Sequence, residues 1–182
     1  LLKDPNNQEA KLVLMAIALE KNHLDELYKL RIDESKTKND LFEFLFFSEK
    51  GIKNKSDSSY AFLEIVRSSY SKNETEYLQN YNFLLFYTSL SILINNTNFE
   101  AVFIKGQLFQ IIENYLFAEI NYLKIPQTSD FFLDAQRNIA FIYTKENIIE
   151  DTETKIISIL QKNNEDYELQ KILADFYRLE KK

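Results

Sequence analysis

Few residues in this chain of 182 have side chains suited to metal or acid–base chemistry. His23 is the sole histidine and there is no cysteine. The chain therefore lacks the side chains for metal sites and catalytic triads that are built on imidazole or thiolate. His23 lies in an expected turn, where a solvated side chain accounts for it. The two glycines, Gly51 and Gly106, are isolated, so no glycine-rich phosphate loop is present. We therefore expect no metal and no other cofactor.

Paired carboxylates are the remaining candidates for catalysis, because glycosidases and similar enzymes use two of them. Glu113 and Glu119 fall in one expected helix, but their spacing of six residues points them to different faces. The other pairs stand at expected turns or helix starts, where acids favour the helix dipole: Asp25/Glu26, Glu150/Asp151 and Glu165/Asp166. We therefore expect a protein that is not an enzyme. Catalysis would require carboxylates that converge in a pocket only in the folded chain.

The composition favours a helical protein whose partner is not nucleic acid. Gly and Pro number only 2 each, too few for the many turns of an all-β fold. The 15 Phe and 11 Tyr supply large core side chains in the absence of Trp. The net charge is −6, and no run of Lys or Arg is interleaved with aromatic residues, as nucleic-acid binding would need.

No transmembrane segment is predicted. The most apolar window, 83–94, is too short to cross a bilayer and has Asn on both sides. The chain begins with Leu1 and not Met, so we expect a fragment or a processed form of a soluble protein, cytoplasmic or exported. Heavy use of Asn, Lys and Ile is typical of an AT-rich genome.

Apolar spacing predicts about nine helices joined by short loops, so that consecutive helices lie antiparallel. The two longest, 74–94 and 99–123, are apolar on more than one face and are expected to be buried in the middle of the fold. A single domain, 1–182, is expected, with a sub-boundary near 125–130 at Pro126. The other helices are expected at 9–21, 24–31, 40–50, 58–71, 130–146, 148–161 and 166–182, with polar loops at 33–39 and 53–59.

Two stretches of the chain repeat with a fixed 34-residue period. Ile139-Ala140-Phe141-Ile142-Tyr143 aligns with Leu173-Ala174-Asp175-Phe176-Tyr177. A period of this size is typical of helical arrays, in which each unit buries its apolar face only against its neighbours. The small residues Ala140 and Ala174 are expected where two helices approach closely. The period is not expected to hold between residues 41 and 123, because the central helices are too long for it.

These residues resemble the tetratricopeptide (TPR) repeat family. Its first helix carries a Leu, then a small residue, then a Tyr three further on, as in Leu173, Ala174 and Tyr177. Its inter-helix turn is Gly-x-aromatic-x-x-Ala, which 147–152 and 22–27 follow in degenerate form. The chain departs from the family pattern at several positions. Met15 stands at the position of the small residue, and Leu27 and Thr152 stand at the position of the Ala. Gln136 and Gln170 stand where the family frequently has Trp.

The resemblance implies an all-α fold: a right-handed stack of about four antiparallel helix pairs, or α-solenoid, with a C-terminal capping helix. It also implies a non-enzymatic scaffold that binds a peptide or protein segment in a concave groove. The groove residues would be Asp134, Arg137, Phe141, Lys145, Glu168, Lys171, Asp175 and Arg178. Phe141 stands where TPR proteins that clamp a terminal carboxylate have an amide, so that class of partner is not expected.

Two other interpretations stay open. The charged residues of the predicted groove can be a solvated helix face that binds nothing. A different class of protein is a helical-bundle surface or periplasmic protein that binds an apolar ligand between the helices at 74–94 and 99–123, where aromatic residues are densest. The identity of the partner and the oligomeric state are left open.

Overall fold

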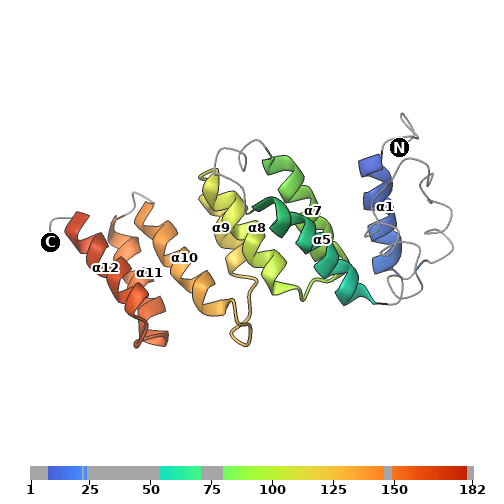
Figure 1. Cartoon of the computed structure of the whole chain (residues 1–182). Coiled ribbons are helices and arrows are strands. Elements are labelled where there is room, and N and C mark those ends of the chain that lie inside the picture. The colour runs from blue at the N-terminus through green and yellow to red at the C-terminus, as the bar shows by residue number, and fades with distance from the viewer. Residues whose placement is uncertain (1–7, 22, 24–53, 71–79, 146–148, 180–182) are drawn as a thin grey trace. The chain divides into compact units, whose positions relative to one another are not determined.

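The computed structural model describes residues 8–21, 23, 54–70, 80–145 and 149–179. These ranges hold eight helices and no strand, which confirms the expected all-α class (Figure 1). The helices are α1 (Gln8–Glu20), α5 (Lys55–Tyr70), α7 (Tyr81–Ile94), α8 (Phe99–Ile111), α9 (Tyr115–Tyr122), α10 (Phe132–Lys145), α11 (Ile149–Lys162) and α12 (Tyr167–Leu179). The helices expected at 24–31 and 40–50, and the loop at 33–39, lie outside the described residues.

Contacts within the chain define two compact units, 1–101 and 102–182, which we describe separately. The division falls in the first turn of α8. The stretch 125–130, expected as a sub-boundary, lies inside the second unit, where it forms the turn between α9 and α10.

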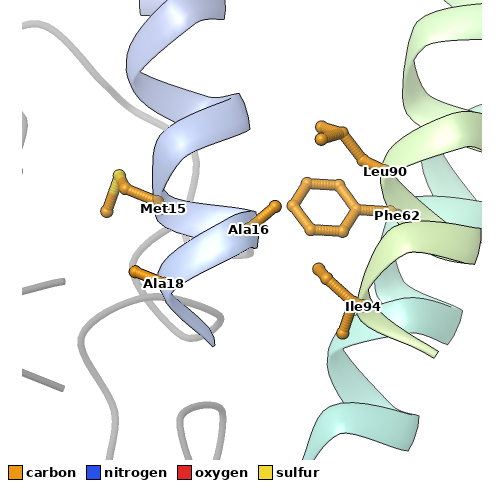
Figure 2. Packing of buried hydrophobic residues seen from close by; sticks show 6 residues of the cluster. All are labelled: Met15, Ala16, Ala18, Phe62, Leu90 and Ile94. Atoms are coloured by element: carbon orange, nitrogen blue, oxygen red, sulfur yellow. The ribbon is translucent and has the colours of Figure 1, made fainter. Parts of the chain in front are cut away.

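The core of the first unit forms where α1 packs on α7 and on Phe62 of α5. Figure 2 shows Ala16 of α1 facing the ring of Phe62, with Leu90 and Ile94 of α7 on either side. All four side chains are buried. Because Ala16 has only a methyl group, the large ring can fill the space against α1 without a clash.

A buried polar cluster joins α5 to α7 in the same unit. Ser59 Oγ donates to the Ser91 carbonyl and Ser91 Oγ donates to the Ser59 carbonyl, each at 2.8 Å. Asn98 Nδ2 donates to Ser59 Oγ at 2.9 Å, and both serines are completely buried. The predicted loop at 53–59 is therefore wrong from Lys55 onward. Ser59 in this stretch bonds to Ser91 of α7, and Asn54 begins α5 by accepting from the Asp57 N–H at 3.1 Å.

The single helix expected over 99–123 is also wrong, because it divides into α8 and α9. Glu113 adopts a left-handed backbone with φ of 58°. The Asn114 N–H donates to the Phe109 carbonyl at 2.9 Å, which closes the end of α8. The Asn114 side chain then accepts from the Phe117 N–H at 3.4 Å and starts α9.

With this break, the outer boundaries of successive two-helix stretches recur with the 34-residue period from 81 to 179, whereas the ends of α7, α9 and α11 at Ile94, Tyr122 and Lys162 do not. The starts of α7, α9 and α11 are at Tyr81, Tyr115 and Ile149, and the ends of α8, α10 and α12 are at Ile111, Lys145 and Leu179. The turn hydrogen bonds recur as well. The N–H groups of Asn98, Phe132 and Asp166 donate to the carbonyls of Asn95, Ser129 and Asn163, at 3.1, 3.0 and 3.0 Å. The expectation that the period fails between 41 and 123 is therefore wrong for residues 81–123.

The small residue of the period lies at Gly106, Ala140 and Ala174. Gly106 is buried, and a Cβ added there would lie 2.5 Å from Cε1 of Tyr122, so no larger residue fits without a shift. Ala140 is completely buried, but Ala174 is exposed. The expectation of a close helix contact at Ala174 is thus wrong. The neighbours of each helix account for the difference. Ala140 belongs to α10, which packs against α11 and α12, whereas Ala174 belongs to α12, the last helix described.

Candidate functional site

The eight predicted groove residues lie on α10 and α12, which pack against each other in the second unit. On each helix they pair with neighbours three or four residues away. Arg137 Nη1 lies 2.7 Å from Asp134 Oδ1, and Arg178 Nη2 lies 3.2 Å from Asp175 Oδ1. The looser pair Lys171–Glu168 has a nitrogen–oxygen distance of 3.9 Å. Most of these contacts are exposed ion pairs, which contribute at most about 1 kcal/mol each to stability.

Arg137 is the predicted groove residue that bonds across to the other helix. Its Nε donates to Asp166 Oδ1 and Oδ2 at 3.2 and 3.0 Å, and its Nη2 lies 3.0 Å from Oδ2. Asp166 in turn accepts from the Leu169 N–H at 3.1 Å and so caps α12. Arg137 therefore holds the start of α12 against α10, a structural task that sequence reasoning missed.

The electrostatics of this pair follow from its geometry. Burial acts to raise the pKa of Asp166, but the hydrogen bonds from Arg137 and from the Leu169 N–H outweigh it and leave that pKa below its ordinary value. The hydrogen bond to Asp166 is the main reason that the pKa of Arg137 is raised. Both groups are therefore charged at neutral pH, and the ion pair is complete.

Phe141 is the apolar member of the predicted groove, and 38% of it is exposed. Lys145 Nζ lies 5.0 Å from the centre of its ring, within range of a cation–π contact. The other members comprise three acidic and four basic residues, and Asp166 brings the acids to four. Among the eight predicted groove residues, Phe141 is therefore the one aromatic ring, and the charges of the others nearly cancel.

The described ranges hold no group of three or more His, Cys, Asp or Glu residues that could bind a metal ion. Among the same residues, no helix is long and apolar enough to cross a membrane. Glu119, one of the carboxylates considered for catalysis, accepts a hydrogen bond from Tyr143 Oη at 2.5 Å.

Two tyrosine–glutamate bonds repeat at the 34-residue period. Tyr143 Oη donates to Glu119 Oε1 at 2.5 Å, and Tyr177 Oη donates to Glu153 Oε1 at 2.8 Å. Each bond links one helix to the next along the chain, α9 to α10 and α11 to α12. The equal spacing of the two Glu residues and of the two Tyr residues was a signal in the sequence that could have found these bonds.

The exposure of α9 contradicts the expectation of a buried helix. Leu116 and Leu123 are both 62% exposed, and Phe117 is 49% exposed. Sequence reasoning placed them in the centre of the fold because it treated 99–123 as one helix that is apolar all round. Only Ala118, Asn121 and Tyr122 of α9 are buried.

No family model matches the sequence, and no curated protein or solved structure matches it either.

Proposed function

We propose that this protein is a non-enzymatic scaffold of the TPR type, which binds a peptide or protein segment on the face formed by α10 and α12. In this proposal, α9 to α12 belong to a right-handed stack of antiparallel helix pairs. The observation that carries it is the 34-residue recurrence, from residue 81 to residue 179, of the outer boundaries of two-helix stretches and of the turn hydrogen bonds.

A third copy of the family pattern supports the proposal. The small residue Gly106 is followed three residues later by the aromatic Phe109. The turn between α8 and α9 then reads Glu113-Asn114-Tyr115-Leu116-Phe117-Ala118, which matches Gly-x-aromatic-x-x-Ala except at its first residue. Glu113 has the left-handed backbone for which glycine is the usual residue. The pattern therefore extends one unit further toward the N-terminus than the sequence first indicated.

The surface of α10 and α12 suits a peptide that has an apolar anchor. Exposed aromatic rings surrounded by polar groups are typical centres of protein interfaces. Phe141 provides such a ring, and the balanced charges around it provide a polar rim. Since the charges nearly cancel, an apolar side chain of the partner, and not its net charge, would supply most of the affinity.

The test is selection of binding peptides from a random library on the purified chain, followed by affinity measurements with variants. We expect Phe141→Ala to weaken the selected peptides at least about tenfold, as for the anchor residue of an interface. Phe83→Ala is the matched control, because Phe83 is 43% exposed but lies on α7 in the first unit. Equal binding to wild type and Phe141→Ala would contradict the proposal, as would a failure to select any peptide.

The alternative function, binding of an apolar ligand, depends on a pair of long helices at 74–94 and 99–123. The structure divides the second of these and describes the first only from residue 80. No observation now favours that class of protein over the scaffold.

A further inference from the structure

The α9 face, defined as Ile112, Leu116, Phe117, Ile120 and Leu123, is an exposed apolar surface on the second unit. Positions 116, 120 and 123 recur at helical spacing, so they lie on one side of α9, and Ile112 stands just before its start. The five side chains are between 40% and 62% exposed. At about 200 Å² for a fully exposed large side chain, they present roughly 500 Å², in the range of about 300–600 Å² for the largest apolar patch of a typical monomer, which is often functional.

The period itself shows that packing within the fold does not require these apolar residues. One period further along the chain, the equivalent positions hold Glu146, Glu150, Asp151, Thr154 and Ile157. α9 and α11 both pack against α10, yet four of the five positions equivalent to the α9 face are polar. The apolar character is thus particular to α9, where Phe117 stacks on Phe109 of α8 with ring centroids 5.4 Å apart and the other four side chains are at least 40% exposed.

The charges at the two ends of the α9 face have opposite signs. Glu113 lies just before α9 and Lys124 just after it, and both are exposed. Neither has an ion-pair partner within the ranges that the structure describes. Burial lowers the pKa of the half-buried Lys105, and the positive charge of Lys124 lowers it further, so the C-terminal end of α9 is electropositive.

We propose that the α9 face is the interface of a homodimer with two-fold symmetry, in which α9 of a second copy lies antiparallel on it. Antiparallel pairing brings Glu113 of each copy to Lys124 of the other, and it brings Phe117 opposite Ile120. A two-fold interface makes each of these contacts twice. A parallel arrangement would instead place equal charges together. This proposal goes beyond peptide binding, because it uses α9 and leaves Phe141 free.

The exposed area fits a dimer of ordinary size. A standard interface covers about 800 Å² on each partner, of which about 60% is apolar. The roughly 500 Å² of the α9 face matches that apolar share, while Glu113, Lys124 and neighbouring polar groups can supply the rim. The second copy therefore offers both the apolar area and the charge pattern that this surface needs.

The first experiment is sedimentation velocity of the full chain from about 1 to about 200 µM, a range chosen for a micromolar dissociation constant. We expect a concentration-dependent dimer. Leu116→Asp and Leu123→Asp should each leave a monomer, with unchanged helical content because both side chains are mostly exposed. Leu179→Asp is the matched control, since Leu179 is 69% exposed on α12 outside the face, and it should dimerise as wild type does.

The second experiment tests the antiparallel arrangement by exchanging charges. Glu113→Lys and Lys124→Glu should each raise the dissociation constant about tenfold, and the double variant should return it to within about threefold of wild type. A monomer at every concentration would overturn the proposal, and so would a dimer that survives Leu116→Asp. A dimer that the double variant fails to restore would overturn the antiparallel geometry. Binding of the monomer to phosphatidylcholine vesicles through Leu116 and Leu123 would assign the face to lipid and likewise overturn it.

Discussion

At the scale of single residues, the predicted groove combines surface contacts with one internal bond. Asp134 pairs with Arg137, and Lys145 with Phe141, as their spacing of three or four residues along α10 allows. Arg137 also reaches Asp166 at the start of α12, so truncating it would loosen the helix pair as well as change the surface. Binding experiments on this face should therefore use Phe141 as the probe residue and avoid Arg137.

The Arg137–Asp166 bond predicts a pH dependence of stability. Because the pKa of Asp166 is lower in the folded chain than in the unfolded one, its contribution is present above about pH 4 and is lost as the pH falls through the folded value. Asp166→Asn should lower the free energy of unfolding by about 1 kcal/mol at pH 7, since Arg137 is partly exposed and screened. Between about pH 5 and pH 2, the difference from wild type should disappear.

Urea denaturation at each pH provides the measurement. Asparagine keeps a side-chain oxygen for the helix cap, as Asn98 does when it accepts from the Ala101 N–H at 3.2 Å. The variant thus removes the charge and retains the cap. Glu165→Gln, at the exposed neighbouring residue, is the control and should follow wild type. A constant difference between Asp166→Asn and wild type at all pH values would show that the ion pair does not stabilise the fold.

At the scale of elements, the break between α8 and α9 controls how the second unit is organised. It ends one helix at Ile111 and begins the next at Tyr115, which restores the 34-residue period. It also turns the apolar residues after Glu113 toward solvent instead of extending α8. Four of the five residues of the α9 face follow this turn.

The left-handed backbone of Glu113 predicts which of two variants at this position is the more stable. Glu113→Gly should be more stable than Glu113→Ala by about 1 kcal/mol, because a residue with a Cβ is disfavoured at φ of 58°. If residues 99–123 formed one continuous helix, glycine would instead be the less stable of the two by about 1 kcal/mol. Both variants remove the carboxylate, so any effect on the proposed dimer cancels between them. Denaturant unfolding of the two variants at equal protein concentration measures the difference.

At the scale of the whole molecule, the 34-residue period relates the helices from α7 to α12 in sequence. One and two periods before the end of α8, the equivalent positions are 77 and 43, which lie outside the described residues. The core of the first unit combines Leu90 and Ile94 of α7 with Phe62 and Ala16, beside the buried serine cluster. α7 is therefore both the first helix that follows the period and part of the core of the first unit.

The same substitution at Ala140 and at Ala174, the two alanines at equivalent positions of the 34-residue period, tests how the period is aligned with the packing of the helices. Ala140→Arg should lower the free energy of unfolding by at least about 3 kcal/mol, because it inserts a charged side chain at a completely buried site. Ala174→Arg is the same substitution at the equivalent but exposed position, and it should change stability by less than about 0.5 kcal/mol. Thermal unfolding of both variants provides the comparison. A large loss with Ala174→Arg would show that this side of α12 is covered.

The sequence by itself determined the helical class and the positions of α1, α10, α11 and α12, because apolar spacing and caps act over a few residues. It also placed Phe141 on a helix surface, since that depends only on the position of Phe141 along the helix. The break at Glu113 was hidden, because the apolar run from Ile111 to Phe117 keeps a helical pattern across it.

Only the tertiary structure decided which side chains are covered. It buried Ser59, which the sequence placed at the end of a polar loop, against Ser91 of α7, and it exposed Leu116 and Leu123, which the sequence placed in a buried helix. It also joined Arg137 to Asp166, which stand 29 residues apart. The physical reason is the same in each case. Local propensity is set by near neighbours along the chain, whereas burial and long-range bonds depend on which distant segment packs there.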